Sequence, residues 1–291
     1  MRILLFGANG QVGYQLRRSL VTLGEVKALT RIEVNLENQL QITNLIRNYK
    51  PHVIVNAAAY TNVDKAEKEP DKAFAINSRA LKIISDEIKQ LGGLLVHYST
   101  DYVFDGKNTK SYIETDTTNP LSVYGKTKLS GENEIIKSGC NHLIFRTSWV
   151  YSKEGANFIN TIVKLAKERG QLRVVSDQIG CPTSADFIAD ITAHCIVQNL
   201  HYKKQGIFNI TAQGKVSWYE LALFVIKELQ TRGIKLKTLP ENITPINTSE
   251  YPLPAERPLY SKLDTEKIKQ IFSLNIPKWQ YHVKMMLDYY K

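Results

Sequence analysis

The chain has 291 residues, of which 43% are hydrophobic and 23% charged. This composition is that of an ordinary globular protein and excludes collagen-like, disulfide-scaffold and broadly disordered classes. The length exceeds the roughly 100–200 residues of a typical domain, so we expect one large unit or a core with a second, smaller lobe. Apolar runs such as 3–6 and 53–55 are far shorter than the ~20 residues of a spanning helix, and no secretory signal peptide is expected.

The charge and the cysteines limit the classes of partner. The net charge is +10, from 38 basic and 28 acidic residues, but basic and acidic residues alternate, as in 64–69, and no run of five basic residues occurs. Such a diffuse charge indicates a solvated mixed surface, with some bias toward anionic small substrates, and argues against nucleic acid. Cys140, Cys181 and Cys195 match no CxxC or zinc-finger spacing, so we expect reduced thiols and a cytoplasmic location.

Short apolar runs alternate with helix-like stretches in the first half of the chain, which predicts βαβ units on a parallel sheet. We expect strands near residues 3–6, 26–29, 53–56, 94–98 and 142–147, and helices near 12–23, 40–49, 71–90, 124–137, 157–168 and 218–231. The segment 239–258 holds five of the ten prolines and is expected to be a long ordered loop or cap. The predicted organisation is a dinucleotide-binding domain at 1–150 followed at 151–291 by a mainly substrate-binding lobe, some segments of which return to the core.

Three glycines, Gly7, Gly10 and Gly13, lie between the first expected strand and the first expected helix. Glycine at these positions permits a tight turn, a close approach of backbone to a pyrophosphate, and close helix–strand packing. The spacing is GxxGxxG and not the GxGxxG of the usual dinucleotide fingerprint, so a plain glycine turn is the alternative. Because the segment begins at residue 7 of a βαβ pattern, we interpret it as a dinucleotide-binding loop.

The residues after the second expected strand indicate which nicotinamide cofactor binds. An acidic residue there would hold the ribose 2′-hydroxyl of NAD and repel a 2′-phosphate. The chain instead has Thr30 and Arg31, a neutral hydroxyl and a fixed cation that suit the 2′-phosphate of NADPH. We therefore expect NADPH; the alternatives are NADH use and a merely solvated loop charge at Arg31.

A YxxxK motif indicates acid catalysis. Tyr124 and Lys128 lie four residues apart on an expected helix, so both side chains project from one face. A free phenol titrates near ~10, and a neighbouring cation stabilises its anion. YxxxK alone also suits an ordinary surface helix, but Thr100 lies just past an expected strand, where ligands bind in open parallel sheets. The three residues together favour hydride transfer to a carbonyl with proton delivery to the oxyanion.

The chain resembles the extended short-chain dehydrogenase/reductases over nearly its whole length. The motifs that carry the resemblance are residues 10–13, 55–61, 63–67, 97–106, 124–128, 145–151 and 177–183, with 257–258 extending it. Their combination is far more specific than any single motif. The resemblance implies an α/β fold, a Rossmann-like doubly wound parallel sheet with a smaller C-terminal lobe that binds a nucleotide sugar.

The resemblance also implies roles for individual residues. Thr100, Tyr124 and Lys128 would form the catalytic set, with Tyr124 as the general acid. The full expected cofactor-binding set, which includes the glycine loop and Arg31 described above, is made up of these residues: Gly7, Gly10, Gln11, Val12, Gly13, Thr30, Arg31, Asn35, Leu36, Ala59, Tyr60, Thr61, Tyr98, Tyr124 and Lys128. The expected substrate-binding residues are Thr100, Asp101, Trp149 and Arg257. Core packing of Trp149 and bracing of the proline-rich segment by Arg257 are the structural alternatives.

One departure from the family concerns magnesium. Members that dimerise around a magnesium ion carry a glutamate early in the first helix, where this chain has Gln15. A neutral amide is a poorer magnesium ligand than a carboxylate. We therefore expect no metal site and either a monomer or a metal-independent homodimer.

The implied activity is the NADPH-dependent reduction of the 4-keto group of dTDP-4-dehydro-L-rhamnose to dTDP-L-rhamnose, a step in making activated sugars for cell-surface polysaccharides. One alternative is a nucleotide-sugar epimerase or dehydratase, although Thr100 is followed by Asp101-Tyr102 and lacks the adjacent glutamate of dehydratases. Another is a non-catalytic regulatory subunit of the methionine adenosyltransferase type. The complete set of Thr100, Tyr124 and Lys128 argues for an active enzyme.

Overall fold

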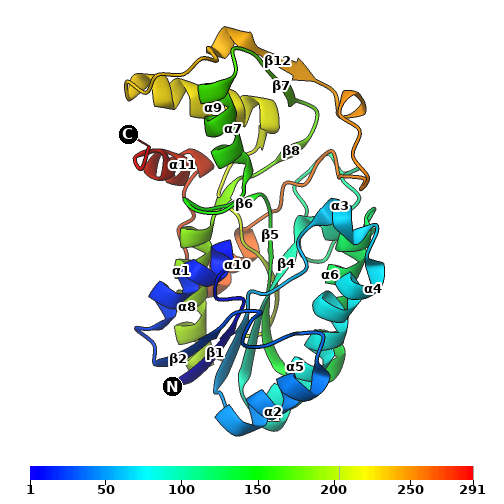
Figure 1. Ribbon diagram of the computed structural model, residues 1–291. Coiled ribbons are helices and arrows are strands. Elements are labelled where there is room, and N and C mark those ends of the chain that lie inside the picture. Colours follow the sequence, from blue (N-terminus) through cyan, green and yellow to red (C-terminus); the bar gives the residue numbers. More distant parts are fainter. Residues whose placement is uncertain (203, 291) are drawn as a thin grey trace.

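The computed structural model describes residues 1–202 and 204–290. Its centre is a six-stranded parallel sheet (Figure 1). The strands, in spatial order, are β2 (Glu25–Leu29), β1 (Arg2–Phe6), β3 (Val53–Asn56), β4 (Leu94–Thr100), β5 (Asn141–Thr147) and β10 (Gly206–Asn209). The α/β fold predicted from the sequence is confirmed. The central strands are buried along their whole length, as expected for a parallel sheet covered on both faces.

Helices cover both faces of the sheet (Figure 1). On one face lie α1 (Gln11–Leu20) and α8 (Ala185–Tyr202); on the other lie α2 (Gln39–Tyr49), α5 (Ala80–Gln90) and α6 (Val123–Ser138). The expected helix at 71–90 is present as α4 (Pro70–Phe74), a π-helical turn at 75–79, and α5, preceded by the short α3 (Val63–Ala66).

The strand order creates a crevice. The chain goes from β1 outward to β2 and then crosses back to place β3 on the other side of β1. Loops leaving the carboxyl ends of β1 and β3 therefore diverge to opposite faces, and ligands of open α/β sheets bind in the crevice between such loops. Gly7 follows β1 and residues 57–61 follow β3, so this topology brings two predicted cofactor segments together.

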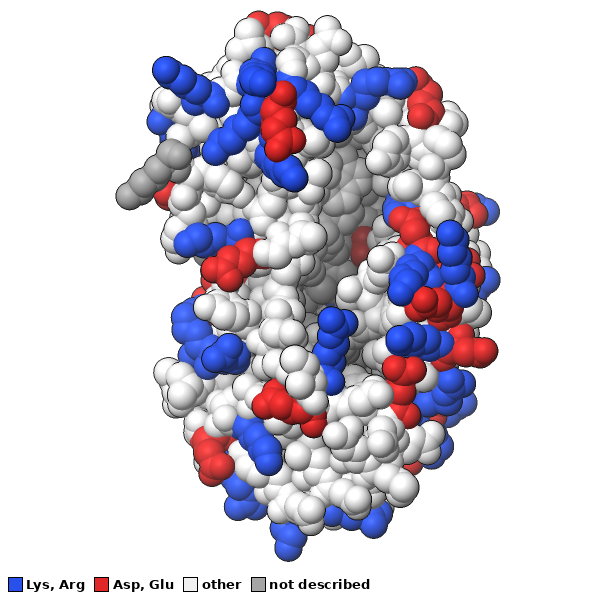
Figure 2. All heavy atoms as spheres, viewed as in Figure 1, with Lys and Arg blue, Asp and Glu red and all other residues white. Residues whose placement is uncertain are grey.

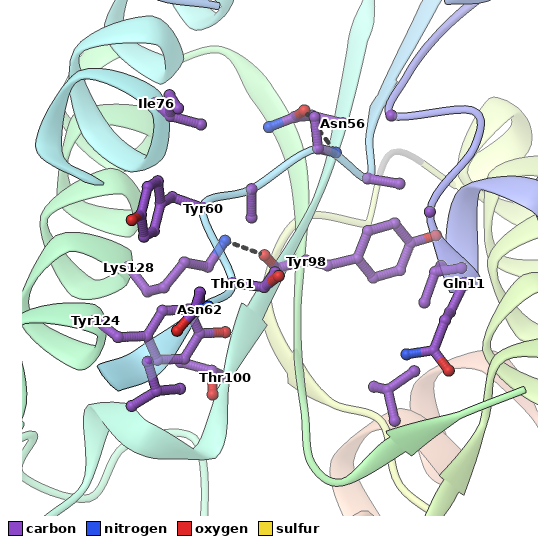
Figure 3. Close-up of a pocket in the computed structure, with 18 of the residues that line it drawn as sticks. Gln11, Asn56, Tyr60, Thr61, Asn62, Ile76, Tyr98, Thr100, Tyr124 and Lys128 are labelled. Carbon is purple, nitrogen blue, oxygen red and sulfur yellow. Dashed lines mark hydrogen bonds between the residues drawn. The ribbon is translucent and has the colours of Figure 1, made fainter. Parts of the chain in front are cut away.

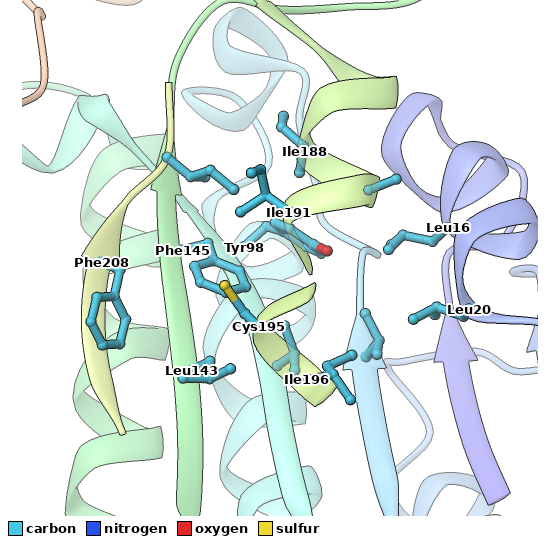
Figure 4. Packing of buried hydrophobic residues seen from close by; sticks show 14 of the residues in the cluster. Leu16, Leu20, Tyr98, Leu143, Phe145, Ile188, Ile191, Cys195, Ile196 and Phe208 are labelled. Carbon is cyan, nitrogen blue, oxygen red and sulfur yellow. The ribbon is translucent and has the colours of Figure 1, made fainter. Parts of the chain in front are cut away.

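Helix α8 was not predicted, although it builds much of the core. Phe187, Ile188, Ile191 and Cys195 are buried against the sheet together with Leu16 of α1 (Figure 4). Because α8 packs on both α1 and the sheet, apolar residues lie on several of its sides and the one-faced helical period disappears. Strand β10 and helix α10 (Glu266–Phe272) also join this core from the second half of the chain.

The second lobe has its own core, built around α7 (Phe158–Glu168), α9 (Trp218–Thr231) and α11 (Trp279–Leu287). Its short strands form three pairs: β7 (Leu172–Val175) with β12 (Ile243–Ile246), β8 (Ile179–Gly180) with β11 (Val216–Ser217), and β6 (Val150–Tyr151) with β9 (Thr183–Ser184). The division at residue 150 stays a prediction.

The expected loop at 239–258 needs correction. It contains β12 and two 3₁₀ turns at 240–242 and 248–250, and no α-helix. Pro245 lies inside β12, where a missing N–H is tolerated because β12 pairs only with β7 and leaves its other edge free. None of the helices in the described part of the chain is long and apolar enough to cross a membrane.

A buried ion pair fixes α6 to the sheet. Arg146 of β5 donates two hydrogen bonds to the Glu132 carboxylate, at 2.9 and 2.7 Å, and both side chains are almost completely buried. Arg146 also donates to the carbonyl oxygen of Glu114. Since α6 carries Tyr124 and Lys128, this pair holds the predicted catalytic helix against the strand next to Thr100.

Replacing one partner of this pair leaves an uncompensated buried charge. We expect Glu132→Gln to lower the free energy of unfolding by ~3–5 kcal/mol, measured by urea denaturation. The control is Asp86→Asn, which removes an exposed pair with Lys82 and should cost at most ~1 kcal/mol. Equal losses in the two variants would contradict a structural role for the buried pair.

Candidate active site

One large cavity of about 1180 Å³ lies between the carboxyl ends of the sheet strands and the second lobe. Figure 2 shows it as a groove that runs down this face of the molecule. The predicted site residues that line it are Gly7, Gly10, Gln11, Val12, Thr30, Arg31, Asn35, Leu36, Ala59, Tyr60, Thr61, Tyr98, Thr100, Asp101, Tyr124, Lys128 and Trp149. Gly13 and Arg257 lie outside the lining.

The glycine loop has the shape of an anion cradle. Gly7 has φ +79°, and a Cβ there would lie 2.6 Å from the backbone nitrogen of Ala58, so only glycine fits. A Cβ on Gly13 would lie 1.9 Å from the carbonyl oxygen of Gly7, which explains its absence from the lining. At Gly10 the nearest atom would be 3.4 Å away, so the cavity side of the loop is open. No described side chain caps α1, so its first N–H groups are available to a phosphate.

Gln11 connects this loop to the second lobe. Its side-chain oxygen accepts hydrogen bonds from Ser152 Oγ and Asn157 Nδ2, each at 3.1 Å. Asn157 also caps the N-terminus of α7. The side chain of Gln11 therefore binds the second lobe. Its backbone N–H group is the part of Gln11 that remains for the cofactor contact expected from the sequence.

The end of β2 carries both signs of charge. Arg31 is exposed, lines the cavity and forms no ion pair with any residue that the structure describes. The backbone N–H of Thr30 donates to a Glu33 carboxylate oxygen at 2.7 Å, and this bond lowers the pKa of Glu33. Glu33 was not singled out from the sequence, and it lies outside the cavity lining. Arg31 faces the cavity without an ion-pair partner among the described residues, whereas Lys72, which also lines the cavity, lies 4.0 Å from Glu37.

The loop after β3 is fixed to α6. Tyr60 N–H donates to Asn77 Oδ1 at 2.8 Å, and Asn77 Nδ2 donates to Thr127 Oγ1 at 3.0 Å. Thr127 belongs to α6, between the predicted catalytic residues. Asn77 was missed by the sequence analysis because it lies in the π-helical turn, away from any motif. This bridge sets the width of the cavity between the β3 loop and α6.

Helix α6 brings Tyr124, Lys128 and Thr100 together (Figure 3). Ser122 caps the helix by accepting a hydrogen bond from the Gly125 N–H, which starts α6 just before Tyr124. A Cβ on Gly125 would lie 2.3 Å from the carbonyl oxygen of Tyr102, so the helix packs directly on the 3₁₀ turn 101–103 that follows β4. The predicted trio thus shares one wall of the cavity.

Burial shifts both titrating residues, and the pKa of Tyr124 moves up, opposite to the direction expected from a neighbouring cation. Burial raises the pKa of Tyr124 to about 12, and the neighbouring Thr100 hydroxyl opposes part of that shift. Burial lowers the pKa of Lys128 to about 7. The Lys128 amine donates to the carbonyl oxygen of Tyr98 at 2.6 Å and lies 3.1 Å from His97 Nε2. Tyr124 therefore keeps its proton until an oxyanion takes it, while Lys128 exchanges a proton near neutrality.

A carboxyl group lies beside the trio. Thr100 Oγ1 donates to Asp101 Oδ1 at 3.1 Å, and Asp101 is 2% exposed. Desolvation raises the pKa of Asp101 to about 6. Since Asp101 lines the cavity, it offers a hydrogen-bonding partner to a polar ligand next to Thr100.

Two stacked indoles also line the cavity. The rings of Trp149 and Trp218 are 3.3 Å apart between centroids and almost parallel, at 7°. Trp149 has φ +46°, a conformation in which a bulky residue is strained. A Cβ on Gly180 would lie 2.4 Å from the Trp149 ring, so the ring packs on bare backbone. Trp218 was missed by sequence reasoning, and its one signal is its place directly after the helix-capping Ser217.

Arg257 is held by an acid in this structure. Its guanidinium donates to both carboxylate oxygens of Asp64, at 3.1 and 2.8 Å, and to the carbonyl oxygen of Ala255. Asp64 belongs to α3, which follows the β3 loop. The contact joins the proline-rich segment to the core, as the structural alternative expected.

Further residues of the cavity were not singled out from the sequence, notably Asn56, Tyr102, Ser148 and Trp218. Asn56 and Ser148 follow the same rule as Thr100, because each lies at or just past the carboxyl end of a strand. Applied to every strand, that rule would have found them. Within residues 1–202 and 204–290, no group of three His, Cys, Asp or Glu side chains is arranged to hold a metal ion.

Comparison with known proteins gives one consistent family. The model of the RmlD substrate binding domain matches residues 1–291. The dTDP-4-dehydrorhamnose reductase of Escherichia coli strain K12 is 45% identical over 293 aligned residues, which cover 99% of this chain and 97% of that protein.

Solved structures agree with the sequence comparison. A dTDP-4-dehydrorhamnose reductase of Clostridium acetobutylicum superposes with a TM-score of 0.90 at 35% identity, covering 99% of each chain. A dTDP-4-dehydrorhamnose reductase of Bacillus anthracis, solved in complex with NADP, gives 0.88 at 32% identity and covers 99% of this chain and 98% of that one.

The stacked indoles make the cavity wall testable. Two parallel indoles this close couple their electronic transitions, so we expect an exciton couplet in the circular dichroism spectrum. Trp218→Leu should abolish the couplet and reduce stability by ~0.5–1.5 kcal/mol beyond the lost burial. The control, Trp279→Phe, alters the remaining tryptophan of the chain and should keep the couplet. Persistence of the couplet in Trp218→Leu would rule out the stacking.

Proposed function

The chain belongs to the RmlD substrate binding domain family, and from this premise we propose that it reduces the 4-keto group of dTDP-4-dehydro-L-rhamnose with NADPH, giving dTDP-L-rhamnose. The observation that carries this function is the convergence of Thr100, Tyr124 and Lys128 on one wall of a cavity that also contains the glycine cradle. It is the activity implied by the family resemblance of the sequence.

The residues present fit a nicotinamide dinucleotide. The open side of Gly10 and the uncapped first turn of α1 suit a pyrophosphate, and Arg31, which lines the cavity, offers a guanidinium to a 2′-phosphate. When bound, NADPH supplies the hydride for the reduction. Tyr60 and Thr61 line the cavity between the cradle and Tyr124, so the expected cofactor residues form a continuous path.

Tyr124 is the proton donor in this proposal. Its pKa, raised to about 12, keeps the phenol protonated at neutral pH and therefore ready to protonate an oxyanion. Thr100 supplies a hydroxyl that stabilises the same oxygen, and protonated Lys128 stabilises the phenolate left behind. Removal of such a positioned acid costs ~10²–10⁴ in rate.

The remaining cavity residues are assigned to the sugar nucleotide. Asp101 accepts a hydrogen bond from a sugar hydroxyl, and Trp149 offers an apolar ring to the 6-methyl group. Arg257 can reach a diphosphate only by exchanging its Asp64 partner, so we assign it first to bracing the proline-rich segment.

The residues of this site favour the alternatives less. Among the described residues, Asp101-Tyr102 supply no glutamate beside Thr100 for a dehydratase, and the complete catalytic trio has no purpose in a regulatory subunit. Cys140, Cys181 and Cys195 are free and buried, which supports a reducing, cytoplasmic compartment. With Gln15 in place of an acid, we infer a monomer or a metal-independent homodimer.

The first test follows NADPH absorbance with dTDP-4-dehydro-L-rhamnose as substrate. We expect Tyr124→Phe to lower turnover by ~10²–10⁴, because the phenol is the proton donor. Tyr281→Phe, on the exposed surface of α11, is the matched control and should leave turnover unchanged. If Tyr124→Phe kept more than about half of the wild-type turnover, the assignment of the donor would be wrong.

A second test addresses the cofactor. Arg31→Ala should raise KM for NADPH more than KM for NADH, since only NADPH carries the phosphate that the guanidinium pairs with. Arg17→Ala, an arginine of α1 outside the cavity lining, is the control. Equal changes for both cofactors would refute a role for Arg31 in selecting NADPH.

A further inference from the structure

Two polar side chains behind Lys128 have no role in the reaction described above. His97 lies on β4 and Asn56 on β3, each 1% exposed, and the parallel register pairs them directly. Asn56 Nδ2 lies 3.2 Å from His97 Nδ1, and His97 Nε2 lies 3.1 Å from Lys128 Nζ. A buried chain of three side chains therefore runs from β3 through β4 to the catalytic helix.

A backbone group fixes the direction of this chain. Ala58 N–H donates to Asn56 Oδ1 at 3.2 Å, and a backbone amide can only donate (Figure 3, dashed line at Asn56). The Asn56 NH₂ group must therefore face His97 and donate to Nδ1. A neutral imidazole has one N–H, which is then on Nε2 and points at the Lys128 amine.

This arrangement requires a lone pair on Lys128. A neutral amine accepts the bond from His97 Nε2–H and still donates to the carbonyl oxygen of Tyr98 at 2.6 Å. An ammonium group has no lone pair, so protonated Lys128 would face the imidazole N–H with its own N–H. Burial and then the Lys128 charge lower the pKa of His97 well below its usual value, and a hydrogen bond with the Asn56 backbone opposes part of that shift, so the ring is neutral at neutral pH.

Other charged groups do not remove this conflict. Glu132 favours the charged form of Lys128, but both of its oxygens are already bonded to Arg146. From α6, the end of β4 and the β3 loop, the ionisable side chains that line the cavity near Lys128 are Tyr124, Tyr98, Asp101, Tyr102 and Tyr60. Glu69 and Lys65 also line the cavity; Glu69 accepts a hydrogen bond from Tyr60 and pairs with Lys65. Asp101 hydrogen-bonds Thr100 and not the lysine.

We propose that His97, oriented by Asn56, is a positioning residue that sets the pH range of the reduction by controlling when Lys128 holds a proton. The proposal rests on the proposed reductase function, in which protonated Lys128 stabilises the Tyr124 phenolate. Reduction consumes a proton, so turnover falls as pH rises through the Lys128 titration. Burial places the pKa of that amine at about 7.

Two substitutions would each replace the N–H that faces Lys128 with a hydrogen-bond acceptor, by different routes. His97→Gln can turn its amide oxygen toward Lys128 and accept from an ammonium group. Asn56→Asp accepts from both Ala58 N–H and an N–H on His97 Nδ1, which moves the imidazole proton and leaves Nε2 as an acceptor. Both variants should move the alkaline midpoint of kcat upward by about one pH unit or more, so that each keeps an about tenfold larger share of its maximal rate well above the midpoint.

A control variant carries the same added charge at a place far from Lys128. Asn141→Asp adds the same carboxylate at the amino end of β5, far from the carboxyl ends that form the site, and should leave the midpoint unchanged. A merely structural role for His97 would lower kcat equally at every pH. An unchanged midpoint in both His97→Gln and Asn56→Asp overturns the proposal.

A second readout needs no substrate. Nitrogen-15 NMR of the histidine rings distinguishes Nε2–H from Nδ1–H, and His97→Gln identifies the His97 signal among the six histidines. We expect Nε2–H in the wild-type protein and Nδ1–H in Asn56→Asp. An Nδ1–H or charged ring in the wild type overturns the proposal. Absence of NADPH oxidation by the wild type refutes the reductase function, and the NMR result still decides the His97 proposal.

Discussion

Parallel strand direction is the constraint on which this site depends. All six strands of the main sheet end at the same edge, so the turns after β1, β3, β4 and β5 meet there although they are spread over about half of the chain. Gly7, Thr100 and Trp149 are brought to one cavity by this rule alone. The divergence of loops between β1 and β3 then opens the crevice in which a dinucleotide fits.

At that edge of the sheet, the burial of Lys128 controls the proton affinity of its amine. The amine is buried without a carboxylate partner of its own, because the Arg146 guanidinium already binds both oxygens of Glu132. Its hydrogen bonds go to a carbonyl oxygen and an imidazole, and burial lowers its pKa to about 7, so it exchanges protons near neutrality. The ion pair that fixes α6 therefore engages both oxygens of the carboxylate whose charge favours protonated Lys128.

The second lobe completes the cavity through contacts that cross the molecule. Gln11 reaches from the phosphate loop to Ser152 and Asn157, and Trp218 stacks on Trp149 where the chain leaves β5. Each contact joins a residue next to the sheet to an element of the lobe. The cavity walls from the sheet and from the lobe are consequently parts of one packed unit.

Local patterns in the sequence determined the strand–helix alternation, the glycine loop and the shared helix face of Tyr124 and Lys128, because each depends on spacings of a few residues. Only the tertiary structure decided the contacts between segments that are distant in the sequence. Helix α8 and strand β10 return to the core, Trp218 stacks on Trp149, Arg257 binds Asp64, and a strand, β12, forms inside the proline-rich segment. We infer that it also decides when Lys128 holds a proton, since the hydrogen bond from Ala58 to Asn56 fixes which nitrogen of His97 carries the imidazole proton. No spacing in the sequence encodes that direction, because it depends on which strands lie side by side.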